Sequence, residues 1–118
     1  QYAHARICNI LKYAEEMGTK SGGEPDLTLI KKDEELSLIK SLIHFPETVM
    51  NALENLEPQT VAGYLQGTAS EFHKFYSEHR VVTNDKELTM ARLFLVSAVR
   101  TVLANGLEIL GISKPEKM

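Results

Sequence analysis

The sequence predicts an all-α bundle of about five helices with short connections. Apolar residues recur at spacings of three and four along most of the chain, and Gly and Pro interrupt this pattern at helix-length intervals. Only residues 80–86 (RVVTNDK) have a strand-like composition, and that stretch is too short to found a sheet. A chain of 118 residues can bury roughly two-thirds of its unfolded surface around one core, so we expect a single domain over residues 1–118.

The first two helices are predicted from amphipathic stripes. The first stripe ends before Gly18, a stop signal that opens a surface loop over residues 18–26, and consists of Ala3, Ile7, Ile10, Leu11, Ala14 and Met17. Asp33 is expected to start the second helix by side-chain capping, with Glu34 and Glu35 favourably placed in its first turn. The second stripe consists of Leu36, Ile39, Leu42 and Ile43.

Prolines mark the starts of the third and fourth helices, because proline suits the first turn of a helix. The third is predicted to begin at Pro46 and to carry Val49, Met50, Leu53 and Leu56. The fourth is predicted from Pro58 to about His79, with Tyr64 and Tyr76 beside an apolar face that consists of Val61, Leu65, Thr68, Phe72, Phe75 and His79.

The fifth helix is predicted from about Lys86 to Leu110, after a turn and cap signal at Asn84-Asp85 and before a stop at Gly111. Its stripe consists of Leu88, Leu95, Val96, Val99, Val102, Leu103 and Leu110. Arg92 falls within this apolar sector, and a buried arginine requires a carboxylate or carbonyl partner. We therefore interpret Arg92 as one half of a structural ion pair first, and as a binding residue second.

Charge and cysteine content exclude several classes of protein. Thirteen Lys and Arg against sixteen Asp and Glu give a net charge of −3 and a pI near 5.8, which argues against a partner bound mainly through phosphates. A single cysteine excludes an internal disulfide and fits a reducing compartment, either the cytoplasm or an organelle. No apolar run approaches the roughly 18 residues of a membrane span, so we expect no membrane partner. Because the first residue is Gln1, we expect a piece of a longer protein.

The chain lacks the motifs of metal, cofactor and catalytic sites. Cys8 is alone, and the four histidines form no pairs at zinc-ligand spacing. No Glu-x-x-His of a di-iron bundle occurs, and Ser21-Gly22-Gly23 precedes no phosphate-binding GK[ST]. We therefore expect no metal, no cofactor and no catalytic residue in this chain.

Two groups of residues are candidates for binding. Tyr2, Arg6, Asn9 and Tyr13 share a narrow sector beside the first apolar stripe. In a generic helix the two rings would pack at the helix edge with Arg6 extended over them. In a binding helix the same residues would stack on splayed single-stranded bases and read their edges.

The second group lies at the end of the fourth helix. Tyr76 falls at the edge of the apolar stripe, where its hydroxyl reaches solvent or a ligand. His79 and Arg80 follow at the helix end, where their structural role would be to cap free carbonyls.

Three segments of the chain form an ordered set of motifs. They are residues 1–11 (QYAHARICNIL), the stretch from Tyr64-Leu65 through 71–76 (EFHKFY) to Arg80-Val81-Val82, and the end of the chain from Arg92-Leu93 through 99–107 (VRTVLANGL) to Leu110-Gly111-Ile112, Pro115-Glu116 and Met118. Together they resemble the C-terminal domain of arginyl-tRNA synthetase. The Asp-Ala-Leu-Arg tetrapeptide that names this domain type is absent. The resemblance covers essentially the whole chain, with residues 18–32 the least constrained part.

This resemblance implies a helical anticodon-binding domain of the DALR type, as found in class I aminoacyl-tRNA synthetases. Such a domain grips the anticodon loop of arginine tRNA and monitors the middle anticodon base, a cytosine. By position, Tyr2 and Arg6 would line the pocket, Tyr76 would stack, His79 and Arg80 would lie near the loop backbone, and Met118 would close the pocket; the helical sector adds Asn9.

The resemblance also implies a division of labour within a longer enzyme. HIGH and KMSKS-like motifs are absent here, so arginine activation with ATP and magnesium would belong to a catalytic domain of the same protein. The implied partners are arginine tRNA and that catalytic domain, with synthetase-associated proteins as further candidates.

Two alternatives stay open. A helical protein-interaction module would suit the net acidic surface equally well, and an exposed apolar patch without an aromatic–arginine sector beside it would favour that function. The same domain type also occurs in cysteinyl-tRNA synthetase, but the tail from Gly111-Ile112 to residues 115–118 (PEKM) favours the arginine enzyme.

Overall fold

The computed structural model describes residues 2–18 and 25–113, with no side-chain detail for Tyr2, Ile112 and Ser113. The side chain of Tyr2, all of Met118 and most of the predicted 18–26 loop thus lie outside the described residues. Within the described part, no strand occurs and the predicted all-α class is confirmed. The five α-helices are α1 (Tyr2–Glu16), α2 (Asp33–Ile43), α3 (Phe45–Asn55), α4 (Pro58–Glu78) and α5 (Lys86–Ser113), with a short 3₁₀ turn, η1 (Leu27–Leu29), before α2.

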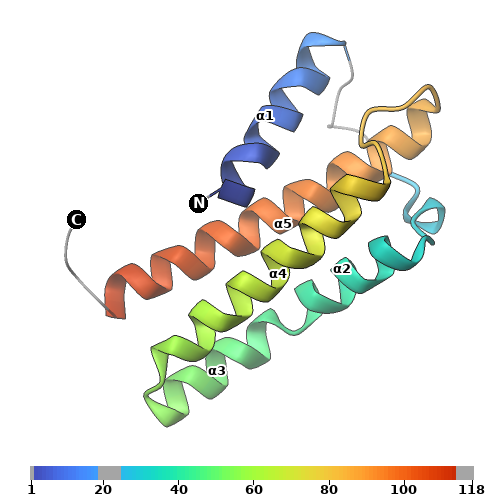
Figure 1. The fold of residues 1–118 in the computed structure, drawn as a ribbon. Helices are drawn as coiled ribbons and strands as arrows, with labels where there is room; N and C mark the ends of the chain where they lie inside the picture. The colour runs from blue at the N-terminus through green and yellow to red at the C-terminus, as the bar shows by residue number, and fades with distance from the viewer. Residues whose placement is uncertain (1, 19–24, 114–118) are drawn as a thin grey trace.

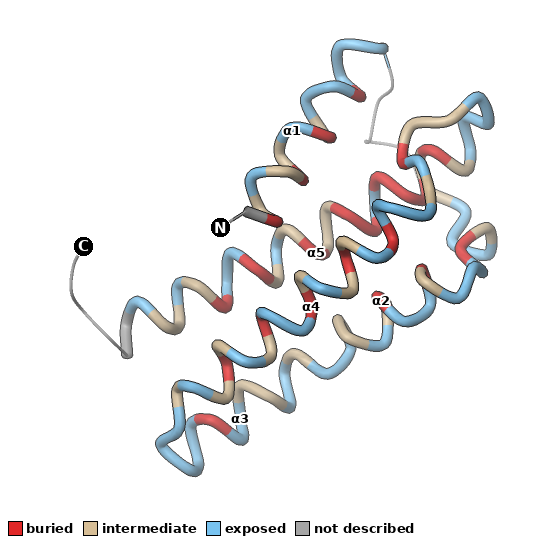
Figure 2. Tube along the Cα trace, in the orientation of Figure 1, coloured by how far each residue is buried: buried red, intermediate tan, exposed pale blue. Residues whose placement is uncertain are grey.

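Helices α4 and α5 form the centre of the bundle and run antiparallel to each other (Figure 1). Helices α2 and α3 follow one another along one side of α4, and α1 packs across α5 on the other side. Figure 2 shows buried residues gathered along α4 and α5 and on the inner face of α1, whereas α3 is mostly exposed. The cleft described below lies where α1 faces the C-terminal end of α4.

Most helix ends follow the sequence signals. Gly18 adopts φ +84, a left-handed conformation that glycine tolerates, directly after α1. Pro46 and Pro58 occupy the first turns of α3 and α4. The Asp85 carboxylate accepts the amide N–H groups of Glu87 at 3.1 Å and of Leu88 at 3.3 Å, which confirms the predicted cap of α5.

The start of α2 differs from the prediction. Asp33 lies inside the first turn, and the carboxylate that satisfies free amide groups belongs to Glu35. Its Oε1 accepts the N–H groups of Lys31 at 3.2 Å and Lys32 at 3.0 Å. The expectation that Asp33 caps this helix is therefore wrong, because the longer Glu35 side chain reaches back to the chain that precedes the helix.

The inner faces of α2 and α3 also differ from the prediction. Leu38 is fully buried in α2, while Leu36 and Ile43 are exposed, Ile43 by 69% of its surface. In α3 the small Ala52 is buried, and the predicted core residues Met50, Leu53 and Leu56 are exposed. Because α2 and α3 are outer helices that cover one side of α4, only a narrow face of each is buried.

Helix α5 continues beyond its predicted stop. It runs through Gly111 to Ser113, so the prediction that Gly111 ends it is wrong. A glycine inside a helix costs only about 1 kcal/mol relative to alanine, which a long packed helix absorbs.

The core confirms the predicted faces of α4 and α5. Val61, Leu65, Thr68, Phe72 and Phe75 of α4 are all buried, as are Leu95, Val96, Val99 and Leu103 of α5.

By length and composition alone, Lys86–Gly111 is apolar enough to cross a membrane. About a third of its most apolar window is buried in the bundle, where the helix packs against α1 and α4.

A buried ion pair joins three segments at one end of the bundle: the start of α2, the first part of α5 and the chain after α4. Arg92 Nε donates to Glu35 Oε2 at 2.7 Å, and the two side chains are 6% and 0% exposed. The second nitrogen, Nη1, donates to the carbonyl of Arg80 at 2.6 Å. This confirms the interpretation of Arg92 as a structural ion-pair residue and identifies its carboxylate and carbonyl partners.

Removing the Arg92 charge should destabilise the fold strongly. Arg92→Met leaves the Glu35 carboxylate buried without its cation, so we expect a loss of about 3–5 kcal/mol in the free energy of unfolding. Urea denaturation followed by helical circular dichroism measures this loss. Adding Glu35→Gln should recover part of it, because the amide oxygen still accepts from Lys31 and Lys32. A loss below about 1 kcal/mol for Arg92→Met would contradict the assignment.

Two helical glycines should respond in opposite ways to alanine. A Cβ at Gly63 meets no atom within 4 Å, so Gly63→Ala should raise the free energy of unfolding by about 0.5–1 kcal/mol. A Cβ at Gly106 would lie 2.5 Å from Leu65 Cδ2, so Gly106→Ala should lower it by about 1 kcal/mol or more. The same denaturation assay compares both variants, and equal stabilisation by the two would refute the close packing of α5 on α4.

Candidate functional site

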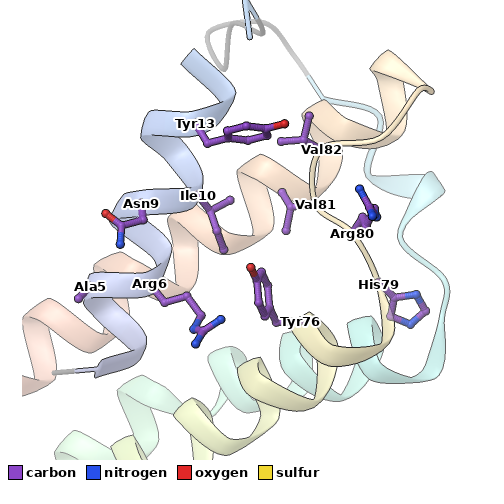
Figure 3. A pocket seen from close by; sticks show the side chains of 10 residues that line it. All are labelled: Ala5, Arg6, Asn9, Ile10, Tyr13, Tyr76, His79, Arg80, Val81 and Val82. Atoms are coloured by element: carbon purple, nitrogen blue, oxygen red, sulfur yellow. The ribbon is translucent and has the colours of Figure 1, made fainter. Parts of the chain in front are cut away.

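A cleft of about 710 Å³ opens between α1 and the chain that follows α4 (Figure 3). Its α1 side presents one face of the helix, and its other side is formed by Tyr76 and the extended segment after α4. Its lining residues are Ala5, Arg6, Asn9, Ile10, Tyr13, Tyr76, His79, Arg80, Val81 and Val82.

The base of the cleft is a layer of stacked groups. The Tyr76 ring stacks on Phe72 one turn earlier in α4, with ring centroids 5.9 Å apart and an interplanar angle of 25°. The Arg6 guanidinium carbon lies 4.8 Å from the centre of the Tyr76 ring, close enough for a cation–π interaction. Arg6 therefore extends over a tyrosine, as a packing role predicts, but the ring belongs to α4, so the contact joins the two walls of the cleft.

The segment that forms the second wall is held from behind. The Arg80 carbonyl accepts the hydrogen bond from buried Arg92, and Val81 is itself buried. The next turn is fixed by the Thr83 N–H, which donates to Thr89 Oγ1 at 2.8 Å. These contacts fix the backbone, so the Arg80 side chain is left exposed at the edge of the cleft.

His79 lies at the margin of the cleft on the side of α2. Its Nε2 lies 2.8 Å from Glu34 Oε1, within hydrogen-bond distance, and its ring packs beside Phe75 with centroids 5.7 Å apart. The hydrogen bond with His79 lowers the pKa of the Glu34 carboxyl below its ordinary value. The His79 ring therefore contacts a carboxylate and does not cap a helix carbonyl. The Phe75 carbonyl at the end of α4 instead accepts a hydrogen bond from the backbone N–H of His79.

The charged side chains that line the cleft are cationic, although the chain is acidic overall. Among the described residues that line it, the charged side chains are Arg6 and Arg80, and none is acidic. The net charge of −3 is therefore carried elsewhere on the surface. This distribution suits a ligand that combines a planar ring with a nearby negative charge.

The structure brings most of the predicted binding residues to one place. Arg6, Asn9, Tyr76, His79 and Arg80 all line the cleft, although they come from segments some 70 positions apart in the sequence. Tyr2 begins the same helix, but its side chain and Met118 are outside the described part. Tyr13, which the helical sector grouped with Arg6 and Asn9 but the family resemblance did not assign, also lines the cleft. Val81 and Val82 line it as well, and the sequence did not predict them as binding residues.

The arrangement is chemically suited to binding. It offers aromatic faces, guanidinium groups and a carboxamide in an open cleft, which are the groups that hold unstacked nucleobases and read their edges. Among the described residues, no group of three or more His, Cys, Asp or Glu side chains is placed to hold a metal ion.

Comparisons with known proteins agree on one family. The profile of the family described as "DALR anticodon binding domain" matches residues 1–118. The chain is 48% identical to the arginine–tRNA ligase of Geotalea daltonii, 47% to that of Caldanaerobacter subterraneus subsp. tengcongensis and 44% to that of Salinibacter ruber. Each alignment covers 100% of this chain and 21% of the relative, so the chain spans about a fifth of the length of these curated relatives.

The contact between Glu34 and His79 should make stability depend on pH in the acid range. Because the folded-state pKa of Glu34 is lowered, its contribution is present above the ordinary carboxyl pKa and is lost as the pH falls through the lowered value. The difference in unfolding free energy between the parent chain and Glu34→Gln should therefore shrink between about pH 6 and pH 3. Urea denaturation at stepped pH measures it.

A second background tests the cause of this pH dependence. In His79→Ala the same Glu34→Gln comparison should show a flatter pH profile, because the hydrogen bond that lowers the Glu34 pKa is gone. An identical profile in both backgrounds would show that His79 does not cause the effect.

Proposed function

The chain belongs to the family of DALR anticodon-binding domains, and we propose that it binds the anticodon loop of arginine tRNA through the cleft between α1 and the end of α4. One observation carries the proposal: Arg6, Asn9, Tyr76 and Arg80 line a single open cleft that contains aromatic, cationic and amide groups and no described acidic side chain. The match to arginine–tRNA ligases over the whole chain supports the choice of tRNA.

In this proposal the middle anticodon base enters beside Tyr76. A base can continue the stack formed by Phe72, Tyr76 and the Arg6 guanidinium, which is already assembled before the ligand arrives. Asn9 supplies a donor and an acceptor for the base edge, and Arg80 supplies a cation for the loop backbone. Tyr2 is proposed to line the same pocket and Met118 to close it, because these residues occupy the corresponding positions in the family motif.

The net charge of −3 is compatible with this function. Binding through many phosphates requires a broad basic surface, whereas recognition of one splayed base requires a local pocket. The two arginines at the cleft provide that local attraction. We therefore expect weak binding by the isolated chain and a shallow dependence on salt, because few phosphates are neutralised.

We assign catalysis to other parts of the protein. The relatives are arginine–tRNA ligases about five times the length of this chain, and arginine activation with ATP and magnesium would take place outside these 118 residues. Residues 1–118 would bind and orient the tRNA without cofactor or metal, in contact with the catalytic domain of the same protein. A cytoplasmic location fits the single cysteine, and an organellar origin stays open.

One observation favours a second candidate function, docking of another protein or of another domain. Met50 and Leu53 lie one turn apart on α3, Leu56 directly follows the helix and Ile43 precedes it, and all four are exposed. This face lies beside the N-terminal half of α4, at the opposite end of that helix from the cleft (Figure 1). An aromatic–arginine cleft is nevertheless present, so we propose docking as an additional function and not as a replacement.

Tyr76→Ala should weaken binding to an anticodon stem-loop of arginine tRNA by about 1–3 kcal/mol, because stacking on one base is worth that amount. Fluorescence anisotropy with a labelled stem-loop measures the affinity, alongside a stem-loop whose middle anticodon base is changed. The parent chain should prefer the original base, and Tyr76→Ala should lose most of that preference.

Tyr64→Phe provides a matched control on the same helix. The Tyr64 hydroxyl donates to the Ser41 carbonyl, away from the cleft, so its removal should leave stem-loop affinity unchanged. Equal affinity of the parent chain for the original and the changed stem-loop would refute anticodon recognition by this cleft.

A further inference from the structure

We infer that Tyr13 forms a second stacking site in this cleft, for an unpaired nucleobase that flanks the base held at Arg6 and Tyr76. The inference rests on the proposed function and extends it from one base to two. Sequence periodicity groups Tyr13 with Arg6 and Asn9, and the structure gives its ring a separate position in the cleft.

Tyr13 and Tyr76 lie at opposite ends of the cleft (Figure 3). Tyr13 follows Arg6 by seven residues on the same face of α1, which is about 10 Å along the helix axis. Adjacent stacked bases are separated by only roughly 3.4 Å. A base at Tyr13 therefore cannot lie directly on a base at Arg6, and it requires a platform of its own.

The Tyr13 ring is the more accessible of the two. It is 51% exposed against 38% for Tyr76, whose ring already packs against Phe72 and Arg6. An exposed tyrosine on a helix is ordinary in itself. Tyr13 differs because it lines a concave surface, where its hydroxyl end reaches toward Val82 on the opposite wall while about half of the residue stays exposed.

The chemistry of this end of the cleft indicates stacking without base selection. Tyr13 and Val82 offer a ring face and methyl groups at this end, whereas the Arg6 guanidinium lies beside Tyr76 at the other end (Figure 3). Every base has a π-face that can stack on tyrosine, whereas selection requires hydrogen bonds to the base edge. We therefore expect Tyr13 to raise affinity for the loop and to leave preference for the middle base unchanged.

A double-mutant cycle tests this inference. The parent chain, Tyr13→Ala and Tyr13→Phe are each titrated with arginine-tRNA anticodon stem-loops in which one loop nucleotide at a time, on either side of the middle base, is abasic. For the parent chain, one abasic position should weaken binding about 5- to 150-fold. For Tyr13→Ala that same abasic position should have no further effect, while Tyr13→Phe should behave like the parent chain.

The outcomes separate this inference from the proposed function. If the parent chain discriminates the middle base but Tyr13→Ala binds within two-fold of it, the inference fails and the proposed function stands. An equal loss for Tyr13→Ala on every abasic stem-loop would also overturn the inference, since no single base would then occupy the site. If the parent chain does not discriminate the middle base at all, both fail. Circular dichroism checks that each variant is folded.

Discussion

The buried pair between Glu35 and Arg92 is the interaction on which the arrangement of this protein depends. Moving two charges out of water costs several kcal/mol for each ion, so both must be fully paired where they lie. Glu35 meets this demand with Arg92 and with two amide groups before α2, and Arg92 meets it with Glu35 and the Arg80 carbonyl. The pair thereby joins the start of α2, the buried face of α5 and the segment after α4. Hydrophobic packing alone would not specify these directions, because it is not directional.

The cleft inherits its shape from this pair. The Arg80 carbonyl points inward to Arg92, which places the Arg80 side chain on the outside of the same residue, at the edge of the cleft. The opposite wall is positioned by Ile7 and Ile10, which anchor α1 in the core and turn Arg6, Asn9 and Tyr13 toward the segment after α4. Arg6 then contacts Tyr76 across the gap. The structural charges of Glu35 and Arg92 are buried and neutralise one another, while Arg6 and Arg80 line the cleft.

The sequence predicted the central helices well and the outer helices poorly, for a physical reason. Helices α4 and α5 contact neighbours along their length, so a wide apolar stripe such as Val61 to Phe75 has one consistent interpretation. Helices α2 and α3 bury only a narrow face. The sequence around Leu36 and Leu38 is therefore compatible with more than one choice of buried face. Arg92 was identifiable as an ion-pair residue because it lies in an apolar stripe, but its partner Glu35 lies 57 positions away, beyond the reach of any local pattern. The cleft shows the same limit: the helical sector and the family resemblance predicted Arg6, Asn9 and Tyr76, whereas Val81 and Val82 enter it only through the fold.

The central claim is that the cleft between α1 and the end of α4, and not the apolar face of α3, receives the anticodon loop. The most direct measurement is the change in backbone amide chemical shifts of the ¹⁵N-labelled chain during titration with an arginine-tRNA anticodon stem-loop. We predict that the largest changes fall on Arg6, Asn9 and the segment from Arg80 to Val82, with Met50 and Leu53 unaffected. Changes concentrated on α3, with the amides of the cleft unmoved, would contradict the account.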